Sequence, residues 1–107
     1  MRTLLVNANV IDCIQPNPLK GATVVIEDKR IAAIVAPGND QDRAGTPTPE
    51  DNVIDLDGAY LLPGLWDVHV HPDYHSLADM PLADQVTLFG HRLMTALTES
   101  GMVGFRC

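Results

Sequence analysis

The chain has 107 residues and is 46% hydrophobic, which suffices for a small domain with a modest core. Fourteen acidic and seven basic side chains give a formal net charge of −7. Such a surface repels phosphate backbones, so we expect no nucleic-acid partner. No apolar run approaches the ~18 residues of a membrane span, and the N-terminal apolar run is too short for a signal-peptide core. Cys13 and Cys107 form no CxxC motif, so we expect reduced thiols in a cytoplasmic protein.

The N-terminal part of the chain predicts short β-strands. RTLLV and NVIDCI are rich in Val, Ile and Leu, and Asn7 and Ala8 separate them. The polar, proline-containing stretch IQPNP then predicts a turn. We therefore expect two strands before the first long turn.

A hairpin is expected next, with arms at residues 24–26 and 31–35 and a polar turn at 27–30. Residues 37–52 are rich in Pro, Gly, Asp and Thr and lack apolar periodicity, which is typical of a mobile surface loop. VIDL predicts another strand, closed by the turn signal Asp-Gly.

The pattern changes in the second part of the chain. Pro72 cannot donate a ladder hydrogen bond, so we expect the strand before it to end there. From Leu82 to Ser100 the apolar spacing becomes helical, and Gly101 fits the C-terminal stop. MVGF then begins another apolar run. The order strand, helix, strand predicts a βαβ unit with two parallel strands in one sheet.

The segment WDVHVH, residues 66–71, carries the main candidate site. On a strand, Asp67, His69 and His71 share one face, while the apolar set that includes Trp66 would pack against the following helix. Histidines at i and i+2 have Cα atoms roughly 6.7 Å apart, and their rings can meet on one ion at about 2.0–2.1 Å per nitrogen. Imidazole favours zinc, nickel, copper or iron. Asp67 is placed to orient the pair or to make an outer contact.

An HxH pair alone is common, and its bland interpretation is two polar strand residues. The context favours a site, because Pro63-Gly64 and Pro72 place the pair at the C-terminal end of a strand that feeds a helix. In parallel α/β folds that end carries the active site. Asp73 and His75, in the following loop, are candidates to face a substrate or are simply loop residues. No residue in this chain is assigned a catalytic role.

PGLWDVHVH, residues 63–71, resembles the PGxxDxHxH signature of the amidohydrolase superfamily of metal-dependent hydrolases. The upstream stretches NANVID, VVIEDKRIAAI and VIDLDGAYLLPG resemble that family's opening strands. ESGMVGFR resembles the segment that usually ends in GxTTxRD. Within the superfamily, the chain is most similar to the prolidase-like and imidazolonepropionase-like branch.

The resemblance implies a mixed α/β fold in two parts. Residues 1–62, with the loop at 37–52, would form part of a small β-sandwich, and residues 63–107 would start a (β/α)8 barrel. It implies that His69 and His71 bind a divalent metal, with zinc expected. The activity implied is hydrolysis of amide or cyclic amide C–N bonds, other than simple peptide bonds, in a small-molecule substrate by metal-activated water.

Some features depart from the family pattern. Val103-Gly104 stands where two threonines are usual, and Cys107 stands where Asp is usual. A barrel of this kind needs ~250 residues, so the chain looks like an N-terminal portion, and we expect it to be inactive alone. Two alternatives remain: a non-enzymatic metal- or partner-binding β-module, or one chain of a split barrel. Uncovered apolar surface predicts an oligomer or a partner that supplies the rest of the barrel.

Overall fold

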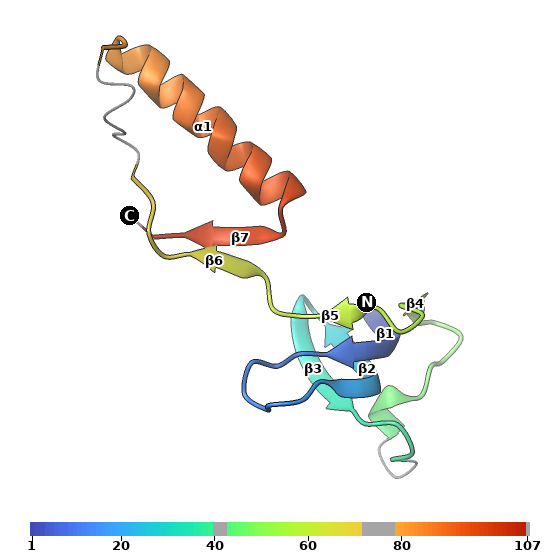
Figure 1. Cartoon of the computed structure of the whole chain (residues 1–107). Coiled ribbons are helices and arrows are strands. Elements are labelled where there is room, and N and C mark those ends of the chain that lie inside the picture. Colours follow the sequence, from blue (N-terminus) through green and yellow to red (C-terminus); the bar gives the residue numbers. More distant parts are fainter. Residues whose placement is uncertain (40–42, 72–78, 107) are drawn as a thin grey trace. The chain divides into compact units, whose positions relative to one another are not determined.

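The computed structural model describes residues 1–39, 43–71 and 79–106, which fall into two compact units, Met1–Pro63 and Gly64–Cys107. The first unit contains a five-stranded mixed sheet. The second contains a two-stranded parallel sheet and one long helix (Figure 1). The mixed α/β class expected from the sequence is confirmed at this level.

The sheet of the first unit is built around β1 (Arg2–Val10). β2 (Leu19–Glu27) pairs with β1 antiparallel, and β3 (Arg30–Val35) pairs with β2 antiparallel. On the other side, β4 (Asn52–Asp55) pairs in parallel with the first half of β1, and β5 (Tyr60–Leu61) pairs in parallel with its end. Of the sandwich expected from the resemblance, the structure therefore shows one mixed sheet.

The two strands predicted at the N-terminus are one strand with an irregularity, so that prediction was wrong. The pairing register of β1 with β2 shifts between Leu5 and Ala8, and Asn7 has φ 55. Asn tolerates this left-handed conformation better than most residues, and such a residue is a common β-bulge device. The Asn7 amide donates to Asp55 Oδ1 at 2.9 Å. The interruption seen in the sequence is thus a bulge rather than a turn.

The predicted hairpin is confirmed, but its turn is shorter than expected. Glu27 and Arg30 are a cross-strand pair, which leaves only Asp28 and Lys29 in the turn. Both have positive φ, 48 and 66, which is the type I′ geometry that suits the twist of a hairpin. Polar residues at the strand ends made the turn look longer.

Buried side chains cover both faces of the central strands. Leu4 and Val25 are cross-strand partners and are fully buried, whereas Val24 is buried on the opposite face, because alternate strand residues point to opposite sides. The buried apolar residues are Leu4, Ala8, Val10, Ala22, Val24, Val25 and Val35. The first unit therefore has a small core of its own.

Part of the segment 37–52, which we expected to be a mobile loop, packs on this sheet and is hydrogen-bonded to it. It contains a 3-10 helix, η1 (Arg43–Gly45), and a Cβ added to Gly45 would lie 3.1 Å from the Val35 side chain. The Arg2 guanidinium donates to the Ala44 carbonyl oxygen and, at 3.1 Å, to Asp51 Oδ2. The side chain of Asp51 is only 4% exposed. The start of β1 thus holds residues 43–51 against the sheet.

In the second unit, β6 (Leu65–Asp67) and β7 (Met102–Phe105) pair in parallel, with α1 (Leu82–Glu99) between them in sequence. This confirms the predicted strand, helix, strand order and the predicted helix. After α1, the Ser100 N–H donates to the Ala96 carbonyl at 3.2 Å and Gly101 has φ 70, the usual left-handed end of a helix. Among the described residues, no helix has both the length and the apolar character needed to cross a membrane.

The described residues of the second unit form no core of their own. None of its residues at 64–71 or 79–106 is buried. Trp66 and Val68, which the sequence predicted to pack under the helix, are 65% and 73% exposed, so that prediction was wrong. Leu82 and Val86 of α1 are also exposed. Two strands and one helix offer too little surface to enclose these side chains.

Candidate metal site

The histidine pair follows β6 rather than lying on it. β6 ends at Asp67, so the expectation that the strand continues to Pro72 was wrong for residues 68–71, and Pro72 itself lies outside the described residues. Asp67 is the last residue of β6 to pair with β7, and its carbonyl oxygen accepts from the Arg106 N–H at 2.8 Å. Its carboxylate then accepts from the His69 N–H at 3.0 Å. Such a turn is typical of Asp and competes with continued strand.

The imidazole rings of His69 and His71 meet at their Nε2 atoms, which are 2.9 Å apart. The ring centroids are 4.6 Å apart and the planes cross at 82°. This distance is that of a hydrogen bond whose donor depends on the ring tautomers. Both residues are exposed, so the pair is accessible from solvent. The two nitrogens that the sequence predicted as ligands therefore point to one place.

The chemistry and spacing of this pair suit a divalent metal. Two metal–nitrogen bonds of about 2.0–2.1 Å would span the 2.9 Å between the two Nε2 atoms at a nitrogen–metal–nitrogen angle of about 90°. A tetrahedral angle would need the two nitrogens to lie about 3.3 Å apart. The two nitrogens thus need to move apart by only a few tenths of an ångström, about 0.4 Å, to reach the tetrahedral separation. Among the described residues, no third His, Cys, Asp or Glu joins the pair in a metal-binding group. The pair fits as two ligands of a larger set.

Of the other candidate site residues, Asp67 is the one that the structure describes. Asp73, His75 and Cys107 lie outside the described residues. Asp67 contacts the backbone of His69 through its carboxylate, and the hydrogen bonds of the described residues show no contact from it to either ring. His91 is exposed on α1.

A cross-strand pair beside the site was missed by the sequence analysis. Trp66 and Gly104 are Cα partners in the parallel pair of β6 and β7. A Cβ added to Gly104 would lie 2.8 Å from the Trp66 ring, so the ring lies directly over this glycine. Gly104 is one of the positions where the resembled family usually has threonine, and the Trp66 ring takes that space. This pairing depends on the register of β6 against β7, which cannot be read from the sequence alone.

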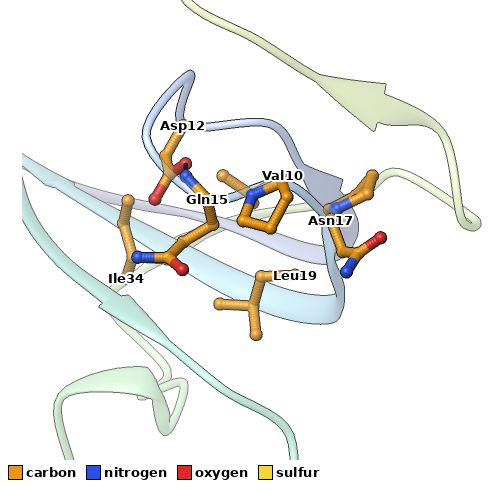
Figure 2. A pocket seen from close by; sticks show the side chains of 8 residues that line it. Val10, Asp12, Gln15, Asn17, Leu19 and Ile34 are labelled. Carbon is orange, nitrogen blue, oxygen red and sulfur yellow. Dashed lines mark hydrogen bonds between the residues drawn. The ribbon is translucent and has the colours of Figure 1, made fainter.

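The first unit carries a separate hollow of about 300 Å³ between the end of β1, the following loop, the start of β2 and β3 (Figure 2). Its wall combines apolar and amide side chains with one carboxylate, that of Asp12. The backbone N–H groups of Gln15 and Ile14 donate to this carboxylate at 2.8 and 2.9 Å, and they hold its pKa below the ordinary value. The hollow is lined by Val10, Asp12, Gln15, Pro16, Asn17, Pro18, Leu19 and Ile34. None of the predicted site residues belongs to it.

In parallel α/β folds active sites lie at the C-terminal ends of the strands, and the histidine pair follows the C-terminal end of β6. No protein-family model matches the chain, and a search of the curated proteins finds no significant match. Solved structures do match. A crystal structure named as an amidohydrolase is 27% identical, with a TM-score of 0.68, over 98% of this chain and 25% of that chain.

A Xaa-Pro dipeptidase with methionine bound in its active site is 26% identical, with a TM-score of 0.67, over 98% of this chain and 26% of that chain. A prolidase in complex with N-methylphosphonate-L-proline shares the fold, with a TM-score of 0.72 at 23% identity over 98% of this chain. These neighbours support a place for this chain in the amidohydrolase superfamily, as an N-terminal portion of its members. The chain spans about a quarter of the length of the structures it matches.

Proposed function

We propose that the chain supplies the first two metal ligands of a hydrolase that cleaves C–N bonds. The observation that carries this proposal is the convergence of His69 and His71 at 2.9 Å directly after β6, in a chain of this superfamily. A divalent metal, with zinc expected, would provide a bound water with a pKa near ~7. Neutral imidazole rings would hold it, and Asp67 fixes the backbone that carries them.

We also propose that the second unit begins a (β/α)8 barrel. The parallel pairing of β6 and β7 across α1 is the repeating unit of such a barrel. The exposed apolar side chains of Leu65, Trp66 and Val103 supply surface that further strands and helices would cover. The general base and remaining ligands would come from those later elements, so we expect the 107 residues alone to be inactive.

The substrate class that we propose rests on the resemblance to the family, so it covers a broad range of C–N bonds. One matching structure above 25% identity is named a Xaa-Pro dipeptidase, a name that describes cleavage of a dipeptide. We therefore do not keep the expectation that simple peptide bonds are excluded. Amide bonds, including those of proline-containing dipeptides, are the substrates to test first, with cyclic amides beside them.

The test is a titration of the purified chain with Zn²⁺ in competition with a chelator, because two histidines alone hold the ion more weakly than a complete set of ligands. We expect about one zinc per chain if the pair forms a site. His69→Ala/His71→Ala should lose it, and His91→Ala, which changes an exposed histidine on α1, should keep it. Equal zinc binding in all three proteins, or none in the unchanged chain, would contradict the assignment.

The alternative of a partner-binding module or split barrel is favoured by one observation, the exposed apolar surface of the second unit. We propose that this surface binds another polypeptide, which is either a second copy of this chain or a chain that carries the remaining barrel elements. Size-exclusion chromatography with light scattering should show mass above 11.6 kDa that falls on dilution. A monomer at every concentration would contradict it.

A further inference from the structure

We propose that Asp67 is a positioning residue that brings His69 and His71 together through the backbone of His69. This inference rests on the proposed metal function. It differs from an electrostatic role, because the carboxylate contacts a main-chain N–H and not an imidazole ring.

The geometry after Asp67 differs from that of a continued strand. In a continued strand, the side chains of residues i and i+2 project side by side from Cα atoms roughly 6.7 Å apart. The observed rings instead meet edge to face, with Nε2 atoms 2.9 Å apart. The chain leaves the strand at Val68, directly after the residue whose carboxylate holds the His69 N–H at 3.0 Å. The turn and the convergence therefore occur at the same place.

Asp67 is itself held in place by β7. Its carbonyl oxygen accepts from the Arg106 N–H at 2.8 Å, and its Cα pairs with that of Phe105. The main chain of Asp67 is thus fixed by the sheet, while its side chain reaches forward to the next turn. This arrangement links the position of β7 to the separation of the two histidine nitrogens.

The described hydrogen bond requires an acceptor oxygen and not a negative charge. Asn has a side-chain oxygen at the same position and forms the same type of turn. Ala has no acceptor, so the His69 N–H would lose its partner and the segment would be free to extend. We therefore expect Asp67→Asn to retain the histidine geometry and Asp67→Ala to lose it.

The experiment compares these two variants by Zn²⁺ affinity, measured in competition with a chromophoric chelator. Asp67→Ala should bind Zn²⁺ about 10- to 100-fold more weakly, the usual effect of removing a group that orients a ligand. Asp67→Asn should stay close to the unchanged chain. Asp79→Ala removes the same charge from an exposed position and should have no effect. Equal weakening in the Asn and Ala variants, or none in the Ala variant, would overturn the proposal.

A metal-free measurement separates this inference from the proposed function. Nuclear Overhauser contacts between the two imidazole rings should be present in the unchanged chain and in Asp67→Asn, and absent in Asp67→Ala. The His69 amide should exchange faster only in the Ala variant. If the unchanged chain binds no Zn²⁺ but shows this pattern, the metal function fails and the positioning role stands. If the ring contacts persist in Asp67→Ala with Trp66 fluorescence unchanged, the positioning role fails.

Discussion

The two units carry apolar side chains at similar frequency along the chain but use them differently. In the first unit, β2 is buried on both faces, with Val24 3% and Val25 1% exposed. In the second unit, the strand pair and helix leave Trp66 at 65% and Leu82 at 74% exposure. A five-stranded sheet with fastened loops can cover its centre, and two strands with one helix cannot. Apolar content alone therefore does not make a core, and the second unit needs additional surface to bury its side chains.

The largest effect is expected from a substitution that disrupts the core of the first unit. Leu4 is fully buried, so Leu4→Ala should lower the free energy of unfolding by about 2–5 kcal/mol through lost contacts and the cavity left behind. Urea unfolding followed by far-UV circular dichroism measures it. Leu82→Ala is the matched change in the second unit, and its effect should stay within about 0.5 kcal/mol. Similar losses in both variants would mean that Leu82 is covered in solution.

A second prediction concerns the close contact between Trp66 and Gly104 in the second unit. Gly104→Ala places a Cβ 2.8 Å from the Trp66 ring, whereas a Cβ at Gly90 of α1 meets nothing within 4 Å. We expect Gly104→Ala to destabilise by about 1 kcal/mol, the low end for added atoms, because the exposed ring can tilt away. Gly90→Ala should stabilise α1 by up to about 1 kcal/mol through helix propensity. Trp66 is the only tryptophan, so its fluorescence during thermal unfolding reports on this unit. Effects of the same sign would contradict the packing described.

The smallest effect is a pH dependence confined to the first unit. The Thr48 N–H and hydroxyl, together with the Arg2 guanidinium, hold the pKa of Asp51 below its ordinary value of 3.8. A carboxyl group with a lowered pKa in the folded state contributes stability above its unfolded pKa, and this contribution is lost as the pH falls through the folded pKa. The backbone N–H of Asp57 and the side-chain amide of Asn7 lower the pKa of Asp55 in the same direction.

We therefore expect the first unit to lose stability as the pH falls below 3.8. Asp51→Asn should make this dependence shallower, and Glu50→Gln, at an exposed neighbouring position, should leave it unchanged. Urea unfolding at several acidic pH values measures both. A steeper acid dependence in the Asn variant would show that the sign is wrong.

Elements set by local signals were predicted well from the sequence. The helical spacing from Leu82 placed α1 within one residue at its end, because Gly101 marks the stop. The β2–β3 hairpin followed from two apolar runs around a polar turn, and the parallel pair followed from the intervening helix. The close approach of the His69 and His71 rings agrees with the expectation that both side chains lie on one side of the chain, while their role as metal ligands stays a prediction.

Features that depend on strand partners were not predictable in the same way. Apolar and polar residues alternate throughout WDVHVH, yet β6 ends at Asp67. Pairing with β7 stops there, and the Asp67 carboxylate accepts a hydrogen bond from the His69 N–H. The bulge at Asn7 depends likewise on how β1 meets β2. The packing of Trp66 on Gly104 is a property of register. Each of these needs the neighbouring strand, and the sequence of one strand does not specify it.

The turn at Asp28 and Lys29 has a consequence for how the hairpin forms. Lys29 has φ 66, a conformation that glycine adopts readily and lysine does not, and Asp-Gly is the preferred pair for this turn. The turn sequence is therefore a poor nucleus for folding. The pairing of β2 with β3 and with β1 must hold the turn in shape, so we expect this hairpin to be closed late, by its strands, once the interior around Val25 has begun to assemble.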